Sequence, residues 1–152
     1  MEPRENNGPF NIFAEVETTV EFYHLDPMRV MWHGNYLNFF EIGRRVLLQK
    51  IDYDYYAMEK SGLLFPVVEI SAKYLASLGL GDKVRIKAIL VEYENCLRIK
   101  YEIRNAETGV LTTKGLSTQM ALDTKTGESC FVCPKIFIDK VEALMESRAG
   151  NV

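Results

Sequence analysis

Hydrophobic and polar residues alternate along residues 12–22 of the chain. Nearly every second side chain there is apolar, and the positions between them are mostly acidic or threonine. This period of two is typical of a strand with one buried face, so we predict a strand from Ile12 to Phe22. Pro27 and Gly34 then interrupt the pattern, which predicts a loop over residues 23–34.

A helical period follows the loop. Apolar side chains recur at three- and four-residue spacing from Tyr36 to Leu47. We predict a helix from about Asn35 to Lys50, with Asn35 accepting hydrogen bonds from the first free amides. Further apolar residues widen its hydrophobic surface beyond one stripe, so other elements should surround it. Gly43 lowers helix propensity, which predicts that another element approaches closely there.

The rest of the chain predicts a short helix, four more strands and a terminal helix. The aromatic, acid-rich stretch "DYDYYAMEKSG" is typical of a short helix ending near Gly62. The four predicted strands are Phe65–Leu75, Asp82–Tyr93, Leu97–Asn105 and Val110–Asp123. The connections "YENC", "AETG" and "TKTGE" are short, so these strands should be antiparallel neighbours. A helix from Pro134 to about Ser147 closes the chain.

This order of elements predicts one α+β domain in which a five-stranded antiparallel sheet wraps around a central helix, because that arrangement buries the apolar surfaces of both. The length of 152 residues suits one domain. We assign the domain to residues 12–152. Residues 1–11 are polar and contain Gly8 and Pro9, so we expect a flexible N-terminal arm.

Composition narrows the possible partners. The net charge of −3 argues against a nucleic-acid partner, because phosphate binding uses clustered lysine and arginine. No apolar run approaches the roughly eighteen residues of a membrane span, and the first residues lack a signal-peptide pattern. Three cysteines are too few for a secreted disulfide framework. We therefore expect a cytoplasmic protein without a membrane partner.

The predicted loop collects a carboxylate, both histidines of the chain and its only tryptophan. Asp26 lies just before the predicted helix, whose first amides have no internal partner and carry about half a positive charge. A carbonyl oxygen docked there would be polarised, and an oxyanion would be stabilised. Pro27 removes one amide that could otherwise occupy the carboxylate, so Asp26 could act as nucleophile or general base. Alternatively, Asp26 only caps the loop.

The stretch "DPMRVMWHGNYLNFFEIGRR" closely resembles the loop and helix signature of the hotdog-fold acyl-CoA thioesterases of the 4-hydroxybenzoyl-CoA thioesterase type. The matching residues are Asp26, Pro27, Val30, Trp32, His33, Asn35, Tyr36, Phe40, Glu41 and Arg44. More loosely, the resemblance extends over nearly the whole chain, because the predicted order of elements is that of a hotdog fold.

The resemblance implies a thioesterase that hydrolyses an acyl or aroyl thioester to a free acid and a thiol, without a cofactor or metal. Asp26 would be the catalytic carboxylate, and the backbone amides of His33 and Gly34 would stabilise the oxyanion. The His33 side chain would assist, or would only pack against the loop. The candidate substrate-binding residues are Tyr23, Trp32, Asn35 and Tyr36.

Family members pair with their sheets edge to edge, which implies a homodimer or homotetramer. The substrate would be a thioester of coenzyme A or of an acyl-carrier protein. Some relatives bind coenzyme A through a pair of basic residues early in the fourth strand. This chain has Glu94 and Asn95 at those positions, so contacts with the phosphates must come from other residues. A non-catalytic module that binds acyl-CoA or acyl-carrier protein is the alternative function, and a hydratase or dehydratase ranks last.

Other signals leave alternatives open. Glu41 is a second candidate for the catalytic acid, although its spacing from Arg44 and Arg45 favours an ion pair. Cys130 and Cys133 have the spacing of half a zinc or redox site, but a second pair is missing, so we expect buried thiols.

Two sets of residues have two interpretations each. Basic side chains could bind phosphates or lie on the solvated face of the sheet; they are Lys83, Arg85, Lys87, Arg98, Lys100 and Arg104. Aromatic side chains could line an acyl pocket or belong to the core; they include Tyr53, Tyr55, Tyr56, Phe65 and Tyr74.

Overall fold

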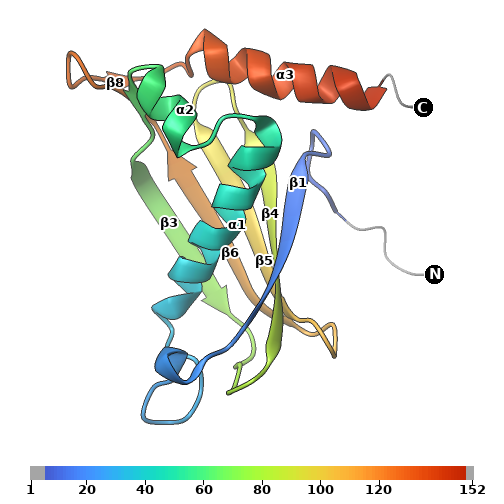
Figure 1. Cartoon of the computed structure of the whole chain (residues 1–152). Helices are drawn as coiled ribbons and strands as arrows, with labels where there is room; N and C mark the ends of the chain where they lie inside the picture. Colours follow the sequence, from blue (N-terminus) through green and yellow to red (C-terminus); the bar gives the residue numbers. More distant parts are fainter. Residues whose placement is uncertain (1–5, 150–152) are drawn as a thin grey trace.

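A computed structural model of the chain describes residues 6–149. Its main sheet consists of β1 (Phe13–Thr19), β3 (Val67–Tyr74), β4 (Lys83–Glu92), β5 (Leu97–Asn105) and β6 (Leu111–Gln119). These strands are antiparallel and lie in the order β1-β4-β5-β6-β3. Figure 1 shows the sheet curling around helix α1 (Asn35–Ile51). The α+β arrangement expected of a hotdog fold is confirmed.

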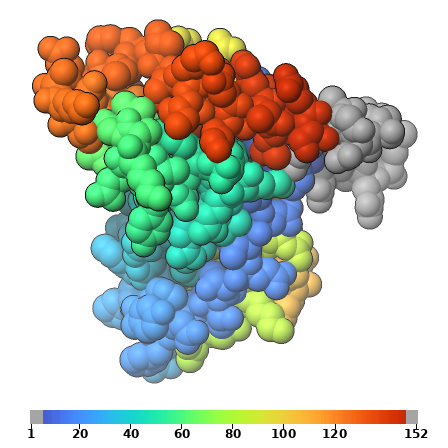
Figure 2. Space-filling view, turned by 45° about the horizontal axis from the view of Figure 1, so that its top comes forward, coloured from blue at the N-terminus to red at the C-terminus, as the bar shows by residue number. Residues whose placement is uncertain are grey.

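A smaller sheet and two helices cover one end of this core. The sheet has the order β2-β7-β8, with β2 at Leu63–Leu64, β7 at Ala121–Asp123 and β8 at Ser129–Cys130. The helices are α2 (Tyr55–Lys60) and α3 (Lys135–Ala149). Figures 1 and 2 both show α3 lying across this end, next to α2 and the end of α1. Residues 6–149 include no helix both long and apolar enough to cross a membrane.

Two glycines let α1 lie close to the sheet. A Cβ at Gly43 would lie 2.8 Å from Cγ2 of Ile86 on β4, so the predicted close approach at this glycine is confirmed. A Cβ at Gly115 on β6 would overlap the ring of Phe40, which is fully buried and stacks on Tyr101 with ring centroids 4.5 Å apart. The small residues thus set the distance between helix and sheet.

Burial alternates along β5, whereas β4 and β6 each bury some neighbouring positions. On β5, buried apolar and less buried polar side chains alternate from Leu97 to Arg104. On β4, however, Lys87 and Ile89 are buried as well. The reason is that Lys87 Nζ lies 4.8 Å from the centroid of the Phe13 ring and donates to Asn7 Oδ1 at 2.6 Å. Lys87 therefore does not belong to a solvated basic stripe.

The predicted arm lies partly outside the described residues, since residues 1–5 are not among them. Its described part approaches β4, because a Cβ at Gly8 would lie 2.6 Å from Cγ2 of Ile89. Phe10 also packs edge-on against Tyr93, with ring centroids 5.0 Å apart. The flexibility of the arm and the assignment of residues 12–152 as the domain stay predictions.

Two predicted strands are too long. β1 ends at Thr19, and Phe22 instead begins a short 3-10 helix, η1 (Phe22–His24). The segment predicted as Val110–Asp123 divides after Gln119, because the chain there passes from the main sheet to the smaller one. Gln119 Nε2 donates to the Phe65 carbonyl at 2.5 Å at this crossing.

Candidate active site

Asp26 lies in a tight turn between η1 and α1. The bridge between Leu25 and Met31 closes the turn. The Asp26 amide donates to the Val30 carbonyl at 2.9 Å, and the Arg29 amide donates to the Asp26 carbonyl at 3.0 Å. Arg29 has a left-handed backbone with φ of 64°, an uncommon conformation that reverses the chain here. The backbone of Asp26 is therefore fixed on both sides.

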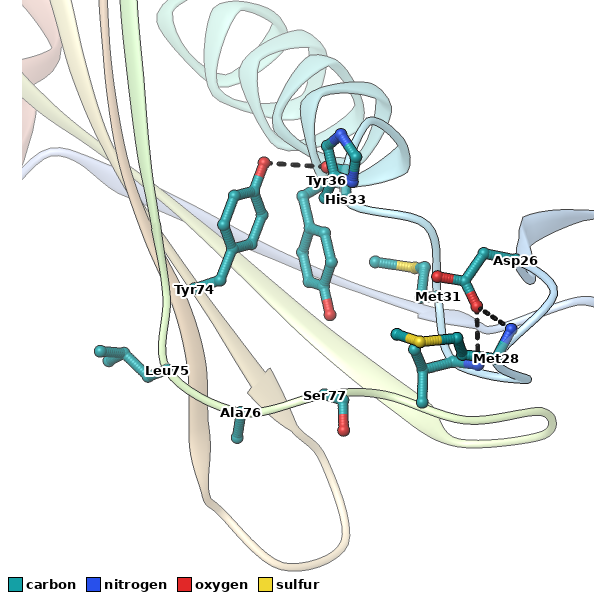
Figure 3. Close-up of a pocket in the computed structure, with 10 residues that line it drawn as sticks. Asp26, Met28, Met31, His33, Tyr36, Tyr74, Leu75, Ala76 and Ser77 are labelled. Atoms are coloured by element: carbon teal, nitrogen blue, oxygen red, sulfur yellow. Dashed lines mark hydrogen bonds between the residues drawn. The ribbon is translucent and has the colours of Figure 1, made fainter.

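The Asp26 carboxylate is anchored through one oxygen. Oδ1 accepts hydrogen bonds from the amides of Met28 at 2.8 Å and Val30 at 3.4 Å. Pro27 removes one local amide, but the amides two and four residues along the chain from Asp26 occupy this oxygen instead. Asp26 does cap the loop. Figure 3 shows its other oxygen pointing away from these two amides.

Three backbone amides at the start of α1 donate to no other group among residues 6–149: that of Tyr36, and those of His33 and Gly34 just before the helix. The next amide, that of Asn35, donates to the Trp32 carbonyl at 2.9 Å. Such free amides at a helix N-terminus carry partial positive charge and can bind a developing oxyanion.

The helix start is capped differently from the prediction. Gly34 occupies the N-cap position and offers no side chain, whereas Asn35 is already the first helical residue. The Asn35 side chain instead donates through Nδ2 to the His24 carbonyl at 2.8 Å. The prediction that Asn35 accepts from the first helical amides is wrong, because its side chain ties the helix to η1.

Two tyrosines form an aromatic wall beside the helix start. Tyr36 of α1 and Tyr74 at the end of β3 meet edge to face, with ring centroids 5.2 Å apart. The Tyr74 hydroxyl donates to the His33 carbonyl at 2.9 Å, as the dashed line in Figure 3 shows. Burial raises the pKa of the Tyr36 hydroxyl, and contacts with Thr113 and the Leu78 backbone only partly offset it. Tyr36 therefore stays protonated at neutral pH.

These groups meet around a pocket of about 360 Å³. Its lining residues come from the loop, the start of α1 and the segment after β3, and are Asp26, Met28, Val30, Met31, His33, Tyr36, Tyr74, Leu75, Ala76 and Ser77. Figure 3 shows Asp26 beside Met28 on the loop, and His33 beside Tyr74 at the first turn of α1. The pocket thus contains three of the seven predicted site residues: Asp26, His33 and Tyr36.

The other predicted side chains lie outside the pocket lining. Tyr23 is 77% exposed and packs on the His24 ring at a centroid distance of 4.3 Å. The Trp32 ring lies over Gly34, in the space where a Cβ of Gly34 would be, and 5.2 Å from the His33 ring. Trp32 and Gly34 therefore pack together next to the pocket.

No sequence motif indicates the pocket wall formed by Tyr74, Leu75, Ala76 and Ser77. In the sequence, Tyr74 is one of several aromatic residues, and the three residues after it belong to no motif. Among the other aromatics, Tyr53 and Phe65 belong to the core. A tyrosine near the end of a predicted strand is a weak sign at best, because its place beside α1 depends on long-range strand pairing.

Glu41, the second candidate acid, lies outside the pocket lining. It forms the predicted ion pair with Arg44, whose Nε also donates to the Tyr55 hydroxyl at 3.0 Å. Burial alone would lower the pKa of Arg44, but the contact with Tyr55 and the charge of Glu41 contribute to raising it. Glu41 thus stabilises a buried cation.

The cysteines form no metal site. Among the described residues, no three His, Cys, Asp or Glu side chains come together as metal ligands. All three thiols are free, and Cys96 and Cys133 are buried. Burial raises the pKa of the Cys133 thiol to about 12, with smaller contributions from Cys96 and Glu92. Cys133 therefore stays a protonated thiol at neutral pH.

Comparison with known proteins identifies the family. Residues 20–143 match the Thioesterase-like superfamily. The protein YneP of Bacillus subtilis, whose name assigns it provisionally to the acyl-CoA thioesterases, is 31% identical over 114 residues, which cover 74% of this chain and 82% of YneP.

Solved structures agree in fold. The DHNA-CoA thioesterase from Staphylococcus aureus superposes with a TM-score of 0.78 and 30% identity, covering 91% of this chain and 93% of that one. A mutant 4-hydroxybenzoyl-CoA thioesterase in complex with 4-hydroxybenzoyl-CoA has a TM-score of 0.75 at 14% identity, over 86% of this chain and 99% of that one. This chain therefore belongs to the Thioesterase-like superfamily and has its hotdog fold.

Proposed function

We propose that the chain hydrolyses an acyl- or aroyl-CoA thioester to a free acid and coenzyme A, with Asp26 as the catalytic carboxylate. Thioester hydrolysis is the reaction class of its family. The observation that carries the residue assignment is that a single pocket contains both the Asp26 carboxylate and His33 at the start of α1. No cofactor or metal takes part.

The reaction would proceed at the pocket as follows. The thioester carbonyl oxygen points at the amides of His33 and Gly34, which polarise it. The second oxygen of Asp26 attacks the carbonyl carbon, or accepts a proton from a water molecule that attacks it. The oxyanion then collapses, the C–S bond breaks, and the thiolate leaves and is protonated. After direct attack, water hydrolyses the mixed anhydride and regenerates Asp26.

The pocket wall favours an aromatic acyl group. Tyr36, Tyr74 and His33 offer aromatic faces, and the remaining lining is mostly apolar. The S. aureus relative at 30% identity is named as a DHNA-CoA thioesterase, which supports a CoA thioester with an aromatic acyl group. Tyr23 and Trp32 would contact parts of the substrate outside the pocket. A binding role for Asn35 stays a prediction, because its amide already binds the His24 carbonyl.

We also propose that the chain works as a homodimer, alone or within a homotetramer. β3 is an edge strand of the main sheet. Its side chains are exposed although several are apolar, with Val68 56% and Ile70 39% exposed. An open, apolar edge strand is a ready partner for another strand. Pairing there would bring a second copy next to Tyr74 and the pocket.

The test measures free thiol released from short-chain, long-chain and aromatic acyl-CoAs. Asp26→Asn is the informative variant, because the asparagine oxygen can still accept from the Met28 and Val30 amides and so preserves the turn. We expect turnover to fall by about 10²- to 10⁴-fold with the fold retained. Glu41→Gln is the matched control and should keep its activity.

Other outcomes assign the chemistry differently. Equal turnover by Asp26→Asn and the unmodified chain would remove Asp26 from the mechanism. Loss of turnover in Glu41→Gln alone would transfer the role to Glu41. Tight binding of an acyl-CoA without any thiol release would favour the binding-module alternative.

A further inference from the structure

A peptide group carries its carbonyl and its amide on opposite sides. The unit is planar and trans, so a hydrogen bond that fixes the carbonyl oxygen also fixes the direction of the N–H that follows it. The two candidate oxyanion donors belong to neighbouring peptide groups, one joining Trp32 to His33 and the next joining His33 to Gly34. Each donor is therefore held by whatever binds the carbonyl behind it.

The His33 amide is held by the backbone. The carbonyl behind it, that of Trp32, accepts from the Asn35 amide at 2.9 Å. This bond belongs to the turn that starts α1, and no side chain takes part in it. The direction of the His33 N–H therefore follows from the formation of the helix itself.

The Gly34 amide is held by a side chain from another element. The carbonyl behind it, that of His33, accepts from the Tyr74 hydroxyl at 2.9 Å. Gly34 has no Cβ to restrict rotation of this peptide group, so an external anchor has more effect here than elsewhere in the turn. In Figure 3, Tyr74 and Asp26 lie on opposite sides of the helix start. The Gly34 N–H, which points away from Tyr74, is thus directed toward the side of Asp26.

We propose that Tyr74 is a positioning residue that orients and polarises the Gly34 amide as the second oxyanion donor. Donation to the His33 carbonyl polarises the whole peptide group, so the N–H becomes a stronger donor. Tyr74 is itself fixed, because β3 pairs it with Thr113 of β6 and its ring rests on Tyr36. This inference rests on the proposed function and extends it to a residue outside the loop signature.

The test compares Tyr74→Phe with Tyr56→Phe. Tyr74→Phe removes the hydroxyl and keeps the ring in the pocket wall. Tyr56 is 76% exposed on α2 and does not line the pocket, so Tyr56→Phe controls for loss of a surface hydroxyl. On the best acyl-CoA substrate we expect kcat of Tyr74→Phe to fall about ten- to a hundredfold, less than full loss of an oxyanion donor. KM should change by less than about twofold.

A spectroscopic readout follows the peptide group directly. His33 and Gly34 are the only His-Gly pair in the chain. Labelling histidine with ¹³C at the carbonyl and glycine with ¹⁵N therefore yields one correlated NMR peak, which reports this peptide group alone. We expect the peak to move upfield in its proton and carbonyl-carbon shifts in Tyr74→Phe, and to stay in place in Tyr56→Phe.

The outcomes separate this inference from the proposed function. A normal kcat in Tyr74→Phe, a rise in KM alone, or an unmoved His33–Gly34 peak would overturn the role of Tyr74 and leave the thioesterase assignment standing. No thiol release by the unmodified chain would overturn the proposed function, and the catalytic role of Tyr74 with it. A lowered kcat together with a moved peak supports both.

Discussion

At the scale of single residues, the start of α1 depends on the absence of one side chain. Gly34 has ordinary helical angles, with φ of −68° and ψ of −24°, so its backbone conformation does not require glycine. The requirement comes from Trp32, whose ring fills the space of the missing Cβ. Gly34 thus leaves room for the indole ring at the start of the helix.

Substituting Gly34→Ala should push the Trp32 ring outward into solvent. Trp32 is the only tryptophan of the chain and is 49% exposed, so its fluorescence reports the change without interference. We expect a red-shifted emission maximum and easier quenching by acrylamide, with the helical circular dichroism retained. An unchanged emission spectrum would show that the Trp32 ring can avoid the added methyl group without moving into solvent.

The three thiols should differ in reactivity toward iodoacetamide at pH 8. The thiolate is the reactive form, and burial raises the pKa of Cys133 to about 12, so its folded-state thiol stays protonated. Cys130 is only partly buried. Mass spectrometry of the digested protein should find Cys130 alkylated first and Cys133 last. Equal labelling rates in the folded protein would contradict this order.

At the scale of elements, the contact between α1 and the sheet leaves no room for added atoms. Phe40 lies between Gly115 on β6 and Tyr101 on β5, and its ring is completely buried. Because the Phe40 ring stacks on Tyr101, it cannot move away from a larger residue at position 115. Close packing of this kind makes added volume as costly as missing volume.

Gly115→Ala should therefore destabilise the fold by about 1–3 kcal/mol. Gly79→Ala is the matched control, because a Cβ there would meet only Asp82 Oδ2, at 3.9 Å. Urea unfolding of the two variants and the unmodified chain measures the difference. Equal unfolding midpoints for Gly115→Ala and Gly79→Ala would mean that Phe40 can relocate at little cost.

The sequence predicts well the elements whose residues alternate or repeat regularly. β5 and α1 have their predicted positions because each has one consistent period over its whole length. β2 and β8 contain two residues each, too few for any period to appear. The division between β6 and β7 also leaves no trace in the pattern, because both halves are strands and only their pairing partners change.

The residues of the candidate site also fall into a set that a local sequence pattern identifies and a set that it does not. Asp26, His33 and Tyr36 are within eleven positions of one another, so one local signature can identify them. Tyr74 and Ser77 reach the same pocket through the pairing of β3 with β6. Long-range register of this kind depends on the packing of the whole sheet, which no local pattern encodes.

At the scale of the whole molecule, the proposed dimer has a direct test. Val68 lies on the edge strand β3 and is 56% exposed. If two copies pair along β3, a charge at position 68 would lie against the same charge of the partner or against the partner's apolar surface. Val68→Glu should weaken association, whereas Val110→Glu, at a residue 51% exposed but outside the strands, should not. Sedimentation should give at least twice the 17.4 kDa of one chain for the control and less for Val68→Glu. A monomeric unmodified chain would contradict the dimer.

The strand order also has a consequence for how the chain is made in a cell. β1 and α1 leave the ribosome first, yet the partner of β1 is β4, which follows only after α2 and β3. The hairpins β4–β5 and β5–β6 have short turns and can form from local contacts. Until they do, Phe39, Phe40 and Leu47 of α1 have no sheet to cover them. The yield of folded protein during synthesis therefore depends on how quickly the later half of the chain follows the earlier half out of the exit tunnel.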